Sequence, residues 1–205
     1  MLYRFIWILL QPFALFIKII GKDNIPKNRK PIIIVANHIG ETDPAKISMI
    51  FPFKYPIHWF TKREAFKVKE IVNDYQMMGL FRWVVAVFVK IFVTHTLAIA
   101  VDRESTTSKI NRAAIREAVR ILKNSGRIGI FGEGGVGREG SAHPVFVNLA
   151  IKTGADIIPV KIHRSSFWKI TVGNPINQDD KLFNKSGDPD SKQTAHSVMR
   201  LIQTL

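Results

Sequence analysis

Cysteine is absent from the 205-residue chain, and its absence removes several kinds of chemistry at once. Disulfide bonds, thiolate metal sites and a cysteine nucleophile are all excluded. The six histidines are scattered, and none stands at a metal-ligand spacing from a partner, so the sequence predicts no metal site. Acidic residues are also scarce: 16 Asp and Glu face 30 Lys and Arg, which gives a formal net charge of +14.

Such a positive surplus attracts phosphates, whether on nucleic acids, anionic lipids or acidic carrier proteins. Most of the basic residues here stand beside long apolar stretches, together with 14 Phe and 4 Trp. Nucleic-acid modules usually show a basic stripe on an otherwise ordinary soluble domain. The combination therefore favours a membrane surface, and we expect the lipid bilayer and its anionic lipids as partners, with no nucleic acid.

The first twenty residues form an apolar stretch about as long as a membrane span. Charged and polar residues interrupt it, Pro12 would kink a helix at its middle, and no small-x-small cleavage site follows. We interpret residues 1–22 as a membrane-associating helical segment at the bilayer interface, followed by a single folded domain over 23–205. A spanning helix and a buried core helix remain the alternatives. A second apolar stretch, 77–100, suits a membrane-facing helix, the wall of a pocket for a hydrocarbon chain, or a core helix.

The rest of the chain alternates between patterns typical of strands and helices. Continuous apolar runs, as in a strand buried on both faces, or short alternating runs predict strands at 31–37, 57–62, 97–102, 127–131, 156–162 and 167–173. Helical patterns cover 43–51, 64–73, 106–125, 144–153 and the segment from 191 onward. No internal repeat or low-complexity linker is present. The alternation predicts an α/β fold, a single domain with a largely parallel sheet flanked by helices.

The strongest chemical feature is NHIGETD, which follows the first of these strands. His38 comes directly after the strand, and Asp43 follows five residues later at the expected start of a helix. Ligands of α/β sheets bind where strands end. A turn could bring the carboxylate to one imidazole nitrogen, which fixes the tautomer and leaves the other nitrogen as a general base. The alternative is a helix cap at Asp43 beside an ordinary histidine.

Four sequence blocks together resemble the glycerolipid acyltransferase family. His38-x4-Asp43 resembles its first block, and the later blocks follow in the family's order: VDR (101–103), FGEGG (131–135) and IIPVKI (157–162). FTKREAF (60–66) resembles a lysine-bearing stretch between the first two blocks. The resemblance spans roughly residues 31–163, which is most of the chain.

The resemblance implies a membrane-associated O-acyltransferase of phospholipid biosynthesis. The histidine takes the proton of a lipid hydroxyl, and the hydroxyl attacks an acyl thioester directly. In this chain His38 and Asp43 would be catalytic. The substrate-binding residues implied by the other blocks are Lys62, Arg103, Glu133, Gly134 and Arg138. The expected acceptor is 1-acyl-glycerol 3-phosphate, which gives phosphatidic acid, and no cofactor is expected.

The third block departs from the family pattern. Gly132 stands where proline is usual, Gly135 where threonine is usual, and Val136 where an arginine commonly follows, although Arg138 lies two residues on. A different lyso-lipid acceptor and a non-catalytic lipid-binding protein of the same fold are therefore the alternatives. Glu133, being acidic, is expected to hold the loop by accepting hydrogen bonds.

The acyl donor is expected to be acyl-CoA or an acylated carrier protein. Carrier proteins are acidic, and one predicted helix has five basic residues that could form a patch for one: Lys109, Arg112, Arg116, Arg120 and Lys123. A solvated helix face is the alternative. The expected location is the cytoplasmic face of the cell membrane.

Overall fold

Strand β2 runs through the middle of a sheet, and its five residues are all buried. The computed structural model describes residues 8, 11–12, 14–52, 54–66, 98–102, 109–134, 142–166, 168–183 and 190–205. The strands in these parts are β1 (Lys18–Ile20), β2 (Ile32–Ala36), β3 (Ile57–Lys62), β4 (Ile99–Val101), β5 (Arg127–Phe131), β6 (Asp156–Ile162) and β7 (Lys169–Val172). The α-helices are α2 (Asp43–Ile50), α5 (Lys109–Lys123), α6 (Val145–Thr153) and α7 (Ser191–Thr204). Short 3-10 helices cover Lys22–Asn24 and Arg63–Phe66.

The strands are ordered β1-β7-β6-β2-β5-β3-β4 across the sheet. The β6–β7 pair is antiparallel, and every other neighbouring pair among these seven strands is parallel. The predicted α/β fold with a largely parallel sheet is confirmed. Because β6, β2, β5, β3 and β4 run in one direction, their carboxyl ends share one edge of the sheet, which we call the catalytic edge.

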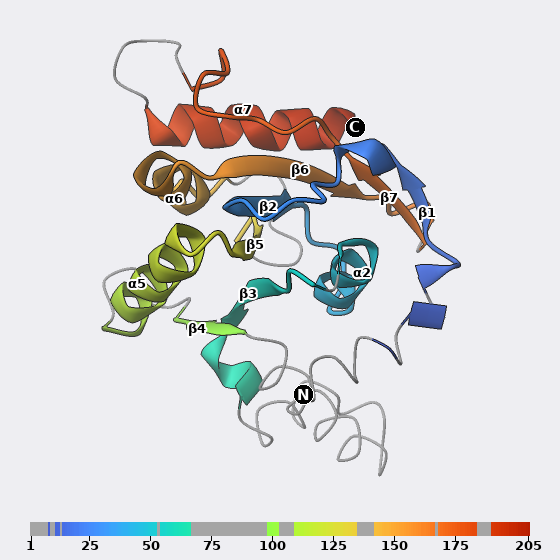
Figure 1. Cartoon of the computed structure of the whole chain (residues 1–205), viewed down its shortest axis with the longest axis horizontal. Coiled ribbons are helices and arrows are strands. Elements are labelled where there is room, and N and C mark those ends of the chain that lie inside the picture. Colours follow the sequence, from blue (N-terminus) through green and yellow to red (C-terminus); the bar gives the residue numbers. More distant parts are fainter. Residues whose placement is uncertain are drawn as a thin grey trace.

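Helices cover both faces of this sheet (Figure 1). Helices α5, α6 and α7 pack on one face in a core that includes Ile33 and Val35 of β2. Helix α2 packs on the other face in a second core that includes Ile32 and Ile34. Successive side chains of a strand point to opposite faces, so a strand inside such a sandwich must be apolar throughout. That requirement explains the uninterrupted run that predicted β2.

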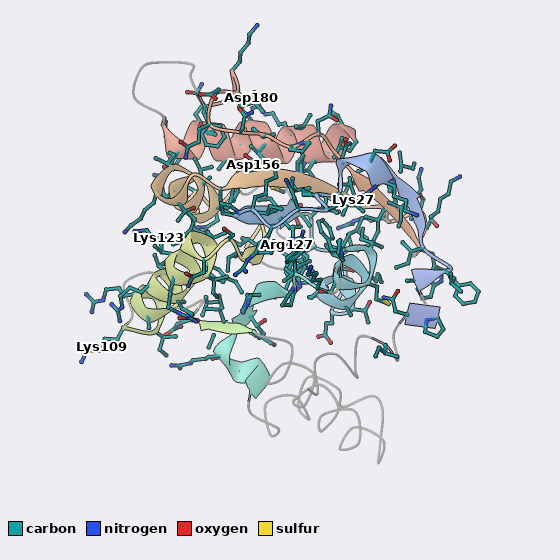
Figure 2. The ribbon with its side chains drawn as sticks, viewed as in Figure 1. Lys27, Lys109, Lys123, Arg127, Asp156 and Asp180 are labelled. Carbon is teal, nitrogen blue, oxygen red and sulfur yellow. The ribbon has the colours of Figure 1, made fainter. Side chains whose placement is uncertain are left out.

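The sheet edge opposite the catalytic edge contains a buried arginine, Arg127, at the start of β5 (Figure 2). One of its guanidinium nitrogens donates a hydrogen bond of 2.8 Å to the carbonyl of Pro26. The guanidinium also lies 5.0 Å from the ring centroid of Tyr55 and 5.8 Å from that of Phe51. The hydrogen bond to Pro26 holds the chain that enters β2, and the ring contacts hold the segment between α2 and β3. The Lys30–Asp156 ion pair lies at the same edge.

The apolar amino-terminal stretch ends in a strand, which corrects part of the expected helical segment. Residues 18–20 form β1, which pairs in parallel with β7. A helix is therefore wrong for these three residues, since their backbone groups bond to a neighbouring strand. Most of residues 1–13 lies outside the described parts, as does the second apolar stretch from 77 to 97. Among the helices that the structure describes, none combines the length and apolar character needed to cross a bilayer.

Strand β1 brings the residues before it to the catalytic edge. Lys18 pairs with Lys169 at the start of β7, and Ile170 of β7 pairs with Ile162 at the end of β6. The chain therefore enters β1 beside the end of β6. Leu15 and Phe16, immediately before β1, are exposed there, at 87% and 68%.

Candidate active site

Hydrogen bonds to both neighbouring strands hold the end of β2, and they fix the position of the His38 backbone. On one side the Asn37 side chain donates to the Ile162 carbonyl (3.0 Å) and accepts from the Ile162 amide (2.7 Å). On the other side the Gly132 amide donates to the carbonyl of Ala36 at 3.0 Å. The side-chain amide of Asn37 thus continues the hydrogen bonding between β2 and β6 after β2 has ended. His38 leaves the sheet in a set direction at the catalytic edge.

His38 and Asp43 form a buried pair. Nδ1 of His38 lies 3.1 Å from Oδ2 of Asp43, and the two residues are 8% and 0% exposed. The same carboxylate oxygen accepts the backbone N–H groups of Ile39 (2.8 Å) and Gly40 (2.7 Å). The five-residue spacing works because the turn wraps its own amides around the carboxylate. This geometry leaves Nε2 as the imidazole nitrogen for a substrate proton.

Asp43 is the first residue of α2 and does not act as its cap. The cap position is Thr42, whose side chain makes no capping hydrogen bond. Burial by itself raises the pKa of Asp43, but hydrogen bonds from His38, Gly40 and Ile39 and the charge of Lys46 outweigh burial and lower its pKa below the usual value. Asp43 is therefore a carboxylate, which can fix the His38 tautomer and stabilise an imidazolium.

An aromatic stack supports the imidazole ring. The Phe131 ring lies 3.9 Å from the His38 ring, centroid to centroid, with 10° between the planes. Trp59 stacks on Phe131 at 5.0 Å, and its indole N–H donates to Ser48 Oγ at 3.0 Å. Gly129 makes room for Trp59, since a Cβ there would lie 2.5 Å from the indole ring. Sequence reasoning missed this stack, because strand patterns do not say which aromatic rings meet.

The glycine-rich loop after β5 reaches the same site. Glu133 is buried, and its Oε2 accepts the backbone N–H of His38 at 3.3 Å. Gly134 has a positive φ of 74°, a conformation that favours glycine, and its N–H bonds to the Phe131 carbonyl. Gly132 permits close approach of α7, since a Cβ there would lie 2.2 Å from the Met199 sulfur. Glycine at 132 thus has a packing reason in this chain.

The other candidate residues differ in how far the structure describes them. Lys62 ends β3, two strands from β2 across β5, or about 10 Å at the usual strand spacing. Arg103 follows directly on Asp102, whose backbone N–H and carbonyl both bond to the Asn111 side chain at 2.7 and 2.8 Å. Arg103 itself and Arg138 lie outside the described residues. The substrate-binding roles of all of these residues stay predictions.

In the parts of the chain that the structure describes, no group of three or more His, Asp or Glu side chains comes together in a way that could hold a metal ion. The chemistry that the arrangement offers is proton transfer: a buried histidine, oriented by a carboxylate, at the edge of a parallel sheet where ligands bind.

The fold is α/β, and its site is a buried histidine paired with a carboxylate where the central strand of the sheet ends. The sequence model of a family described as Acyltransferase matches residues 16–163, which is more than half of the chain. The chain therefore belongs to the acyltransferase family and is an enzyme of that class. The resemblance to glycerolipid acyltransferases drawn from the four blocks is confirmed.

The fold is also similar to a solved structure, that of the 1-acyl-sn-glycerophosphate (LPA) acyltransferase PlsC from Thermotoga maritima. The match has a TM-score of 0.58 and 20% sequence identity, and it covers 98% of this chain and 80% of that one. At this identity the likeness shows the shared fold. No curated protein sequence matches the chain.

Proposed function

We propose that this acyltransferase moves a fatty acyl group from a thioester onto the free hydroxyl of 1-acyl-glycerol 3-phosphate, giving phosphatidic acid for phospholipid synthesis. The observation that carries the proposal is the His38–Asp43 pair, 3.1 Å apart and held by two backbone amides. Such a pair suits the activation of a hydroxyl nucleophile, which is too weakly acidic to ionise unaided.

The reaction proceeds by direct attack, because the chain has no cysteine nucleophile and, among the described residues, the His38 side chain bonds to Asp43 and to no hydroxyl side chain. Nε2 of His38 takes the hydroxyl proton as the acceptor oxygen bonds to the thioester carbonyl carbon. Asp43 stabilises the imidazolium that forms. The carbon–sulfur bond then breaks, and the imidazolium returns its proton to the departing thiolate. The products are an ester and a free thiol.

A phosphate-bearing acceptor suits the basic residues of the family's sequence blocks, of which the structure places Lys62 at the end of β3. Lys62, Arg103 and Arg138 are the proposed phosphate ligands, and Gly134 lets the loop backbone approach the anion. The Thermotoga protein is described as an LPA acyltransferase, which supports the same acceptor here. Because the loop lacks the arginine usual at 136, another lyso-lipid acceptor is the second candidate within the same chemistry.

A bilayer contact would deliver that lipid to the site. Leu15 and Phe16 are exposed at the catalytic edge, and the Phe16 ring lies 6.2 Å from that of Trp168 in the turn between β6 and β7. Two basic residues are exposed nearby in the sequence: Lys18 follows Phe16 by two residues, and Arg164 precedes Trp168 by four. Apolar side chains flanked by basic ones are typical of an anionic membrane surface. We propose that the enzyme binds the cytoplasmic face of the cell membrane through this edge.

The donor proposed here is an acylated carrier protein, with acyl-CoA as the alternative. All five basic side chains of α5 are exposed, from Lys109 at one end of the helix to Lys123 at the other (Figure 2). The helix lies on the opposite side of the domain from β1 (Figure 1). A basic ridge away from the membrane-facing edge suits an acidic protein in solution.

The test is an acyl-transfer assay in lipid vesicles with a labelled acyl thioester and a panel of lyso-lipids. The wild type is compared with His38→Ala, and His196→Ala, an exposed histidine of α7, is the matched control. We expect phosphatidic acid from 1-acyl-glycerol 3-phosphate, and a loss of kcat/KM on the order of 10²- to 10⁴-fold in His38→Ala only. If only another lyso-lipid gives product, that lipid is the acceptor and 1-acyl-glycerol 3-phosphate is not. If no lyso-lipid gives product, the result favours a non-catalytic lipid-binding protein.

A further inference from the structure

Helix α2 contains a buried lysine, Lys46, one turn beyond Asp43. Lys46 is 3% exposed, and its Nζ lies 3.2 Å from Oδ1 of Asp43. Its neighbours on the inner face of the helix, Ile47 and Met49, belong to the apolar core under β2. A lysine is rarely buried unless it is paired, because removing its charge from water costs free energy. The acid beside it is the same carboxylate that orients the catalytic histidine.

The two oxygens of Asp43 therefore have different partners. Oδ2 faces the imidazole and the amides of the turn, at Ile39 and Gly40. Oδ1 faces the ammonium group of Lys46. A carboxylate bound at both oxygens cannot rotate without breaking contacts at each end. The ammonium also offsets part of the negative charge that His38 faces.

We propose that Lys46 is a positioning residue for acyl transfer: it fixes the carboxylate of Asp43 and limits how strongly that carboxylate stabilises the protonated form of His38. The inference rests on the proposed function, since it assigns a role within the same site. In this role Lys46 acts through its contact with Asp43.

An electrostatic consequence follows. Without the ammonium group, the imidazolium of His38 would face an unopposed carboxylate and would be more stable. Glu133, in the loop after β5, is a further acid at this histidine, since it accepts the His38 backbone N–H. The negative charges of Asp43 and Glu133 would then both stabilise the imidazolium form of His38. More of the enzyme would hold a protonated base at a given pH, and the acid limb of its rate profile would move to higher pH.

A purely structural role gives a different pattern. If Lys46 only fills space in α2, its replacement lowers the melting temperature and the amount of folded enzyme, but the shape of the pH profile stays unchanged. The charge of the side chain, and not its volume, is the property to vary. Lys46→Met and Lys46→Gln remove the charge, and Gln keeps a hydrogen-bond donor. Lys46→Arg keeps the charge.

The experiment measures kcat and KM between pH 5 and 9 for the full chain in vesicles of phosphatidylcholine and phosphatidylglycerol. The control is Lys152→Met, which removes an exposed lysine from α6. In Lys46→Met and Lys46→Gln we expect the acid limb of kcat/KM to move up by about one pH unit and kcat to fall about tenfold, with KM changed less. Lys46→Arg should keep the limb within a few tenths of the wild type. If one uncharged variant fails to fold, the other gives the same comparison.

Unshifted profiles in the uncharged variants would overturn the proposal, and so would equal shifts in Lys46→Arg and Lys46→Met. A second readout separates this inference from the proposed function. Histidine-selective NMR can follow the His38 ring through a pH titration, with its signal assigned by comparison with His38→Ala. A titration midpoint that rises in Lys46→Met supports the proposal even if the acceptor is wrong. A midpoint equal to that of the wild type contradicts it, whatever the activity.

Discussion

The ring of Phe131 lies flat against the imidazole of His38, with the centroids 3.9 Å apart and 10° between the planes. The Asp43 carboxylate holds one edge of the same imidazole through Nδ1. A hydrogen bond restrains the ring at its edge, and a stacked ring restrains its tilt. The two contacts come from different elements, since Phe131 ends β5 and Asp43 begins α2.

Replacing Phe131 with leucine should leave His38 in place but hold its imidazole ring less firmly. We expect kcat to fall about tenfold, because a small misplacement of a catalytic group is costly, and stability to change by about 1 kcal/mol, as in other volume-conserving swaps. The matched control is Phe183→Leu, at a buried phenylalanine in the core beside α7. Steady-state kinetics and urea unfolding measure the two effects. Equal losses of kcat in both variants would argue against a role for the stack.

Asp43→Asn should lower kcat, and it should make the free energy of unfolding depend less on pH in the acid range. An amide cannot stabilise the imidazolium, and we expect kcat to fall on the order of 10⁴-fold, as when the acid of a comparable catalytic pair becomes an amide. The pKa of Asp43 lies below its usual value of 3.8, because the hydrogen bonds and Lys46 outweigh burial. The ionised carboxylate therefore contributes stability above that usual value, and the contribution is lost as pH falls through the lower folded-state pKa.

Urea unfolding at a series of pH values between 7 and 2.5 tests the second half of this prediction. The free energy of unfolding of the wild type should fall more steeply below about pH 4 than that of Asp43→Asn. The mutant should be less stable than the wild type at pH 7. Parallel curves over the whole range would mean that Asp43 does not couple proton binding to folding.

Charged substitutions at the exposed apolar side chains before β1 should weaken membrane binding. Leu15→Asp with Phe16→Asp removes apolar surface and adds negative charge, so binding to vesicles containing phosphatidylglycerol should fall at least about tenfold. Ile151→Asp, at an exposed apolar residue of α6, is the control. Vesicle flotation measures the bound fraction. Equal flotation of the two proteins would remove this edge as the membrane contact.

Reversing charges on α5 should discriminate between the two donors. In Arg112→Glu with Arg116→Glu, KM for the acylated carrier protein should rise about tenfold, while KM for acyl-CoA should change little. The carrier effect should weaken at higher salt, because exposed charges are screened. Lys192→Glu with Arg200→Glu makes the same charge change on α7. Equal rises for both donors, or the same rise in the α7 variant, would contradict the proposal.

Local patterns predicted most of the secondary structure. The apolar runs predicted β2, β5 and β6 to within a residue at most, because a strand buried on both faces must be apolar throughout. The apolar face of α5 and Gly154 after α6 marked two helices in the same way. Strand β1 was missed, because three apolar-flanked residues look alike in a strand and in a helix until a partner strand is known.

The sequence by itself also determined the family, through four blocks in order, and the spacing from His38 to Asp43 predicted that the two side chains meet. The tertiary structure decided what surrounds that pair. The aromatic stack under His38 and the contact of Glu133 with its backbone depend on which strands are neighbours, and β5 is the neighbour of β2 although about ninety residues separate them. Lys46 is one turn from Asp43 in sequence, yet only the packing of α2 against the sheet decided that its charge is buried beside the carboxylate rather than solvated.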